Sequence, residues 1–179
     1  RLMLAATLSS NYGIYGPAFE LGVNEAKEAF SEEYLNSEKY EIHHWNLDQP
    51  HSLKPLITRV NRIRRENPAL QQTRNLMFHP VDREEIICYS KWTDDYSNII
   101  LVAANLDPHH THSTWLYLPF EEMGVQTEPT FQMHELVSNA RYMWHAGSNY
   151  LELDPHTLPV QIFRLRRRVR SENDFDYFM

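Results

Sequence analysis

The fold is decided downstream of Pro68, where β-rich runs separated by turn residues begin with Leu76-Met-Phe-His79 and Ile86-Ile-Cys-Tyr-Ser-Lys-Trp92. Further runs follow at 98–105, 113–118, 130–135, 142–144, 149–153 and 158–165. Short strands at this spacing are typical of antiparallel sandwiches. We therefore predict that residues 76–166 form a β-sandwich domain and that the chain is mainly β.

The first 75 residues have a different pattern. We expect a helix over 1–9, a short strand over 12–15, a loop through 18–20, and a second helix that Ser52 caps and Asn67-Pro68 ends. The second helix has an apolar stripe every three or four residues. The order helix, strand, long loop and helix predicts the last part of a (β/α)8 barrel over 1–75. Residues 167–179 form a charged and aromatic tail.

The opening residues 2–8 are apolar nearly all round a helix. Such a helix needs burial on every side. We therefore expect it to pack against structure outside this chain, as part of a larger enzyme.

Composition narrows the classes of partner. The 179 residues carry a formal net charge of −7, so no overall basic field attracts nucleic acid or anionic lipid. Cys88 is the single cysteine and lies in an apolar run, which favours a reduced, buried thiol. No run approaches a membrane span and no secretory signal opens the chain, so a cytoplasmic protein is expected.

Two groups of residues invite a ligand but favour simpler interpretations. The run His109-His110-Thr111-His112 is dense enough for zinc, yet a solvated loop fits it better, so no metal or cofactor is predicted. The aromatic residues of the β part suit cross-strand packing, with a sugar-stacking platform as the alternative. They are Tyr89, Trp92, Trp115, Tyr117, Phe131, Tyr142, Trp144, Tyr150 and Phe163.

The remaining candidates lie upstream of the β part. Lys39 and Tyr40 can both donate hydrogen bonds to phosphate oxygens, although an exposed lysine beside a packed tyrosine is the simpler interpretation. Glu20 follows the expected barrel strand at the end where barrel active sites form, and a structural ion pair is an equal alternative. No catalytic residue is identified in this sequence.

Taken together, several segments resemble the carboxyl end of α-amylase superfamily enzymes, and most closely the α-1,4-glucan:maltose-1-phosphate maltosyltransferase family. The resemblance runs from residue 1 to about 166. It is carried by these stretches: Leu4-Ala-Ala-Thr-Leu-Ser-Ser-Asn-Tyr-Gly-Ile-Tyr-Gly-Pro-Ala-Phe-Glu20, Glu32-Glu-Tyr-Leu-Asn-Ser-Glu-Lys-Tyr-Glu41, Ile57-Thr-Arg-Val-Asn-Arg-Ile-Arg-Arg-Glu-Asn-Pro-Ala-Leu70, Val102-Ala-Ala-Asn-Leu-Asp-Pro-His-His110 and Asn149-Tyr-Leu-Glu-Leu-Asp-Pro-His156.

The resemblance implies a barrel end followed by the family's carboxyl-terminal β-sandwich. It implies a homodimeric parent that transfers maltosyl from α-maltose 1-phosphate to α-1,4-glucan with retention and releases phosphate. The catalytic carboxylates of such enzymes lie on earlier barrel strands, so this part alone is expected to be inactive. Lys39 and Tyr40 match the pair that contacts the donor phosphate.

Two alternatives stay open at this point. In the first, the chain is the tail of another α-amylase superfamily hydrolase or isomerase. In the second, its β part is a stand-alone carbohydrate-binding module. Donor preference separates the first alternative from a maltosyltransferase, and titration with maltooligosaccharides tests the second.

Overall fold

The computed structural model describes residues 1–37, 42–119 and 130–166. The helices are α1 (Leu2–Leu8), α2 (Gly16–Glu20), α3 (Lys54–Glu66) and the 3-10 helix η1 (Pro68–Gln71). The strands are β1 (Leu76–His79), β2 (Ile86–Trp92), β3 (Ile99–Asn105), β4 (His112–Tyr117), β5 (Thr130–Glu135), β6 (Arg141–His145), β7 (Ser148–Leu153) and β8 (Val160–Arg166). Within these described residues, no helix is long and apolar enough to cross a membrane.

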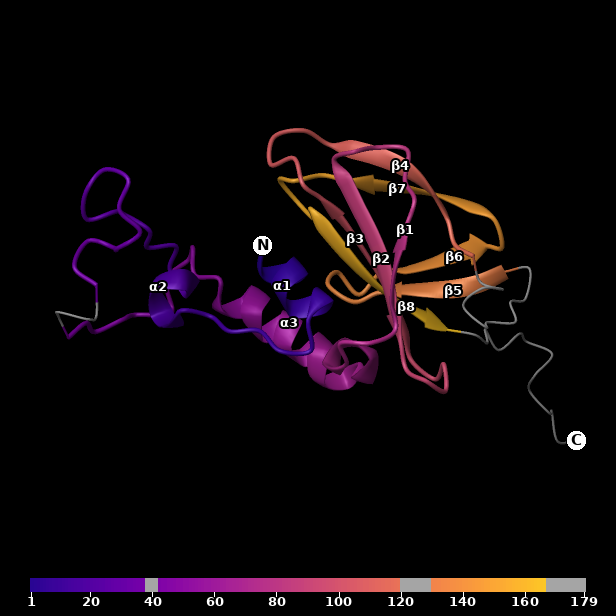
Figure 1. Cartoon of the computed structure of the whole chain (residues 1–179), viewed down its shortest axis with the longest axis horizontal. Helices are drawn as coiled ribbons and strands as arrows, with labels where there is room; N and C mark the ends of the chain where they lie inside the picture. The colour runs from indigo at the N-terminus through magenta and orange to yellow at the C-terminus, as the bar shows by residue number, and fades with distance from the viewer. Residues whose placement is uncertain (38–41, 120–129, 167–179) are drawn as a thin grey trace, which may run out of the picture.

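Two antiparallel sheets form the β part, which confirms the predicted sandwich. One sheet has the strand order β1-β2-β3-β8-β5-β6, and the other pairs β4 with β7. Figure 1 shows β4 and β7 above the larger sheet and α1 and α3 beside it. The molecule therefore has three layers in this region, with the six-stranded sheet between the helices and the small sheet.

The centre of the six-stranded sheet is covered on both faces, and its residues are apolar on both faces. Successive residues of β3 alternate between the two cores: Leu101 and Ala103 face β4 and β7, while Ile100 and Val102 face the helices. Every residue of β3 is buried. The sequence of such a strand is a continuous apolar run, without alternation of apolar and polar residues.

The cysteine lies in the core between the two sheets. Cys88 is buried and free, as predicted. Burial disfavours the thiolate and raises the pKa of this thiol to about 12. The thiol therefore packs as a small apolar group and is a poor nucleophile.

Helix α3 buries one stripe against the sheet, as its pattern predicts. Ile57, Val60 and Ile63 are buried, and the helix ends at Glu66, with Asn67 in the C-cap position directly before Pro68. The predicted cap is displaced by one residue: Leu53 occupies the N-cap position. Ser52 still contributes, because its Oγ accepts a hydrogen bond of 3.2 Å from the amide of Lys54.

The prediction of a strand over 12–15 is wrong. These residues form neither a strand nor a helix, and the predicted loop through 18–20 belongs to α2. A strand requires a neighbouring strand to satisfy its backbone groups. Residues 12–15 have none among the described residues, and Gly16, at φ +60, and Pro17 begin a helical turn instead.

We expected the opening helix to need a partner outside this chain. That expectation is wrong for the face of α1 that meets α3 and the sheet. Leu2, Met3 and Ala6 are buried in the same core as α3, η1 and the six-stranded sheet. The hydroxyl groups of Thr7 and Tyr89 are hydrogen-bonded at 2.5 Å. The chain itself therefore supplies the burial that this helix requires.

Arg64 fixes the end of α1. Its guanidinium donates hydrogen bonds to the carbonyls of Ala6, Ser9 (3.1 Å), Ser10 (2.6 Å) and Leu70 (3.4 Å). The last carbonyls of a helix have no partner within the helix and carry partial negative charge. A cation with several donors in a rigid plane satisfies them together.

Lys91 supports the same point from the sheet. Although it belongs to β2, its ammonium donates to the carbonyls of Leu8 (3.3 Å) and Gln72. The residue is fully buried. Burial, together with the nearby charge of Arg64, lowers the pKa of Lys91. Two cations therefore hold the helical layer against the sheet.

Replacing Arg64 tests this arrangement. Arg64→Ala leaves the carbonyls at the end of α1 without their donors, so the free energy of unfolding is expected to fall by about 2 kcal/mol. Arg65→Ala removes an exposed neighbour of the same type and is expected to change stability by less than about 0.5 kcal/mol. Urea unfolding followed by circular dichroism measures both, and equal losses would contradict the assigned role.

Candidate functional site

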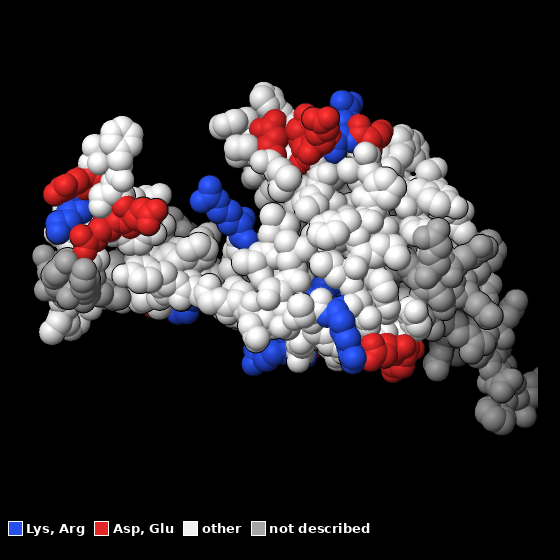
Figure 2. Space-filling model, in the orientation of Figure 1, with Lys and Arg blue, Asp and Glu red and all other residues white. Residues whose placement is uncertain are grey.

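The predicted binding residues belong to a long connection between α1 and α3. Figure 1 shows it extending away from the sandwich, and Figure 2 shows charged side chains of both signs gathered on it. Lys39 and Tyr40 themselves lie outside the described residues. On either side of them, His43 Nε2 donates to the carbonyl of Asn36 at 2.5 Å. The two described flanks of residues 38–41 therefore lie together.

The flank that precedes Lys39 is folded on itself. A β-bridge joins Ala26 and Tyr34, and the amide of Leu35 donates to the carbonyl of Glu25 at 2.8 Å. The ring of Tyr34 packs edge-on against Tyr15, with 5.8 Å between the ring centroids. The segment that leads to Lys39 is thus tied to the residues before α2.

A cleft of about 280 Å³ opens beside this flank, lined by Tyr15, Glu32, Glu33, Tyr34 and Ser37. Glu33 pairs with the ammonium of Lys27 at 3.4 Å. The two carboxylates make the cleft unfavourable for an anion. The phosphate contact that the sequence predicts for Lys39 and Tyr40 stays a prediction.

Glu20 lies at the junction of the connection with α3. It is the last residue of α2, and its backbone carbonyl accepts a hydrogen bond of 2.8 Å from the amide of Leu53. The pKa of Lys54 is raised, mainly by Asp48 and to a smaller degree by the Glu20 carboxylate. The Glu20 carboxylate therefore acts on Lys54 only at long range, and both the ion-pair interpretation and a role in supporting the site stay predictions.

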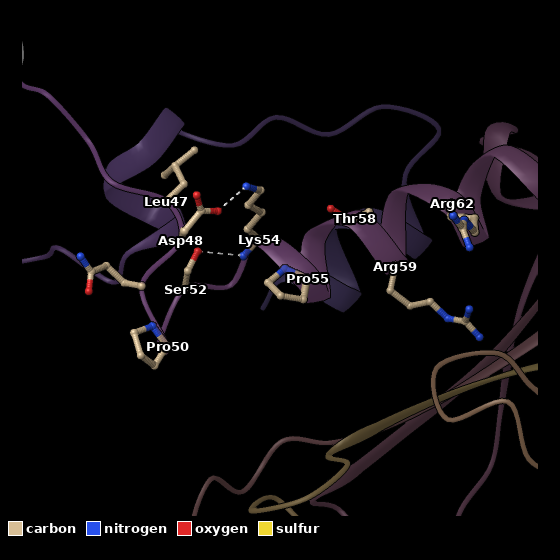
Figure 3. A pocket seen from close by; sticks show the side chains of 10 residues that line it. Leu47, Asp48, Pro50, Ser52, Lys54, Pro55, Thr58, Arg59 and Arg62 are labelled. Carbon is tan, nitrogen blue, oxygen red and sulfur yellow. Dashed lines mark hydrogen bonds and ion pairs between the residues drawn. The ribbon is translucent and has the colours of Figure 1, made fainter.

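A groove of about 680 Å³ runs along the start of α3 (Figure 3). The sequence did not predict it. Lys54 pairs with Asp48 at 2.8 Å on one of its walls. Arg59 turns toward the sheet, where its Nε donates to the carbonyl of Leu136 at 2.7 Å. All of the lining residues lie within 47–62, where the chain turns and enters α3. The groove therefore belongs to the junction of the connection with α3.

The histidine run forms a hydrogen-bonded turn. His110 Nδ1 and His112 Nε2 lie 2.8 Å and 3.0 Å from one oxygen of Asp107. Hydrogen bonds from His112, the amide of His109 and His110 hold the pKa of Asp107 well below its usual range. Over the ranges that the structure describes, no group of three His, Cys, Asp or Glu side chains is arranged to hold a metal ion.

The aromatic residues of the β part divide into two sets. Tyr89, Phe131, Trp144 and Phe163 are buried and Trp92 is half-buried against the same core, which agrees with the packing interpretation. The second set is more than two-fifths exposed, which that interpretation does not explain. It consists of Trp115, Tyr117, Tyr142 and Tyr150.

Comparison with solved structures defines the class of fold. The chain is similar to the α-amylase from Geobacillus thermoleovorans, with a TM-score of 0.59 and 13% identity, over 94% of this chain and 33% of that one. It is also similar to AmyP, with a TM-score of 0.57 and 15% identity, over 92% of this chain and 33% of that one. The fold is therefore that of the β-sandwich tail of α-amylase-type proteins and the segment before it.

Sequence comparison then gives the relatives. Residues 78–165 match the family described as GLGE, C-terminal. The α-1,4-glucan:maltose-1-phosphate maltosyltransferase of Chlorobaculum tepidum is 44% identical over 92% of this chain, and that of Rhodospirillum rubrum is 47% identical over 92%. The chain spans about a quarter of the length of these relatives (25% and 24%). The resemblance stated from the sequence is thereby confirmed.

The Asp107 turn predicts how stability responds to acid. A carboxylate whose pKa is depressed by folding stabilises the native state above its unfolded pKa, near 4, and this contribution is lost as pH falls toward the folded pKa. Asp107→Asn is therefore expected to lower the melting temperature at about pH 7 more than at about pH 3. Glu84→Gln, at an exposed position, serves as the control. A deficit that persists unchanged at low pH would contradict the assignment.

Proposed function

We propose that this chain is the carboxyl-terminal part of a maltosyltransferase that transfers maltosyl from α-maltose 1-phosphate to α-1,4-glucan and releases phosphate. Relatives of that name support the proposal. We extend it to a homodimeric, cytoplasmic parent that needs neither nucleic acid nor a membrane.

The length of the similarity carries the proposal. The match to the Chlorobaculum tepidum protein covers 171 residues, more than the β part contains, so it includes most of the long connection. That connection holds Lys39 and Tyr40. A likeness confined to the sandwich would support only a shared domain, whereas this one includes the segment expected to contact the donor.

The chain's own contribution follows from its contacts. The ammonium of Lys39 and the hydroxyl of Tyr40 donate to the donor phosphate and favour its departure as an anion. Glu20 anchors the connection at α3 through its backbone carbonyl. The sandwich in turn holds α3, through its buried stripe and the bond from Arg59 to Leu136. The β part thereby braces the donor-binding segment.

An isolated chain of residues 1–179 tests where the chemistry lies. Incubated with α-maltose 1-phosphate and glycogen, it is expected to release no phosphate, because the reacting carboxylates of the proposed enzyme lie on other strands. A colorimetric phosphate assay makes the measurement. Turnover by this chain alone would show that those carboxylates are not needed.

Lys39 is tested in the longer protein that the proposal requires. Lys39→Ala removes a charge-assisted hydrogen bond, so kcat/KM for α-maltose 1-phosphate is expected to fall by about tenfold to a hundredfold. Lys27→Ala, which removes the partner of Glu33 in the same connection, is expected to change it by less than about threefold.

Two outcomes would contradict this part of the proposal. Unchanged kinetics in Lys39→Ala would remove the donor contact but leave the family assignment intact. A parent that hydrolyses glucan and ignores α-maltose 1-phosphate would favour the alternative of an α-amylase-type hydrolase.

A further inference from the structure

The outer face of the β4–β7 sheet carries a cluster of exposed aromatic rings. Trp115 and Tyr117 on β4 are 57% and 61% exposed, and Tyr150 on β7 is 52% exposed. Trp115 and Tyr150 are cross-strand partners, and Tyr117 pairs with Ser148. The residues between them, Leu116 and Leu151, point into the sandwich core. We call Trp115, Tyr117 and Tyr150 the aromatic platform.

The two central rings of the platform are tilted against each other. The centroids of Trp115 and Tyr150 are 5.6 Å apart, with 67° between the ring planes. Successive units of an α-1,4-linked glucan turn along the chain, so their faces are not coplanar. A β-1,4-linked glucan presents a flat ribbon, which suits coplanar rings. The tilt therefore favours a curved glucan over a flat one.

A cleft of about 230 Å³ adjoins the platform. Tyr150 and Glu152 form one side of it, and Tyr142 and Gln161 form the other. The hydroxyl of Tyr150 donates to Glu152 Oε2 at 3.0 Å, which sets the orientation of both groups. A sugar binds through ring faces that stack on it and through a few oriented groups that hydrogen-bond its hydroxyls. The platform and the cleft together supply both.

Charge and size argue against other occupants. The outward residues of β4 and β7 include no Lys or Arg, and Glu152 is their only formal charge, so an anionic ligand is disfavoured. Three rings on a two-stranded sheet make a narrow contact surface, which suits a single polymer chain better than a protein interface of standard size. A neutral polyhydroxyl chain matches the platform in both respects.

We propose that the aromatic platform, together with the adjoining cleft, binds an α-1,4-glucan chain at a site separate from the donor-binding segment. The substrate class rests on the proposed function, since a glucan acceptor is what the parent would extend. The site holds a polymer near the enzyme by stacking and makes no contact with the donor phosphate.

Titration of the chain of residues 1–179 with maltoheptaose, followed by tryptophan fluorescence and amide NMR shifts, tests the site. Weak saturable binding is expected, with the largest shifts in β4 and β7. Cellohexaose is expected to bind at least tenfold more weakly. Trp115→Ala is expected to weaken maltoheptaose binding at least tenfold without changing the melting temperature, because the side chain lies outside the core. Trp45→Ala, in the connection, is the matched control and is expected to bind normally.

The outcomes separate this inference from the proposed function. No maltoheptaose binding, or equal binding by Trp115→Ala and the unsubstituted chain, overturns the site. Equal binding of cellohexaose overturns its preference for a curved glucan. In the longer protein, Trp115→Ala is expected to keep the unsubstituted rate with α-maltose 1-phosphate and a short acceptor. Its rate with glycogen as the acceptor is expected to fall. Loss of both rates would instead show that the platform belongs to the donor site.

Discussion

The six-stranded sheet must be covered on both faces, and the rest of the structure follows from this constraint. Its central strands β3 and β8 bury apolar residues on both sides, and leaving either side in water would forfeit the hydrophobic stabilisation of one of the two cores. The β4–β7 sheet covers one face, while α1, α3 and η1 cover the other. The helices are therefore part of the sandwich's core and not an appendage to it.

The helical cover connects stability to the candidate site. Arg64 and Lys91 satisfy the carbonyls at the end of α1, and Arg59 joins α3 to the turn after β5. The connection that carries the predicted donor contacts begins at α1 and ends at α3. The β domain can in this way set the position of a candidate binding segment that extends away from it (Figure 1).

Much of the β part was predictable because its strands alternate with turn residues at short range. All eight runs became strands, with bounds shifted by at most two residues. The strand over 12–15 was not predictable, because a short aromatic segment becomes a strand only if a neighbour pairs with it. Neither was the groove beside Lys54. Its lining residues all lie within 47–62, but the hollow depends on the angle at which the turns over 47–51 lead into α3.

The sequence by itself determined the strand order along the chain, the amphipathic α3, the buried thiol and the family, because these depend on local pattern or on residue identity. Only the tertiary structure decided which aromatic rings are exposed. Trp115 and Trp144 both lie in strands, yet one faces water and the other packs on Phe163. The reason is physical: each strand has two faces, and pairing with the other strands determines which of them meets the core.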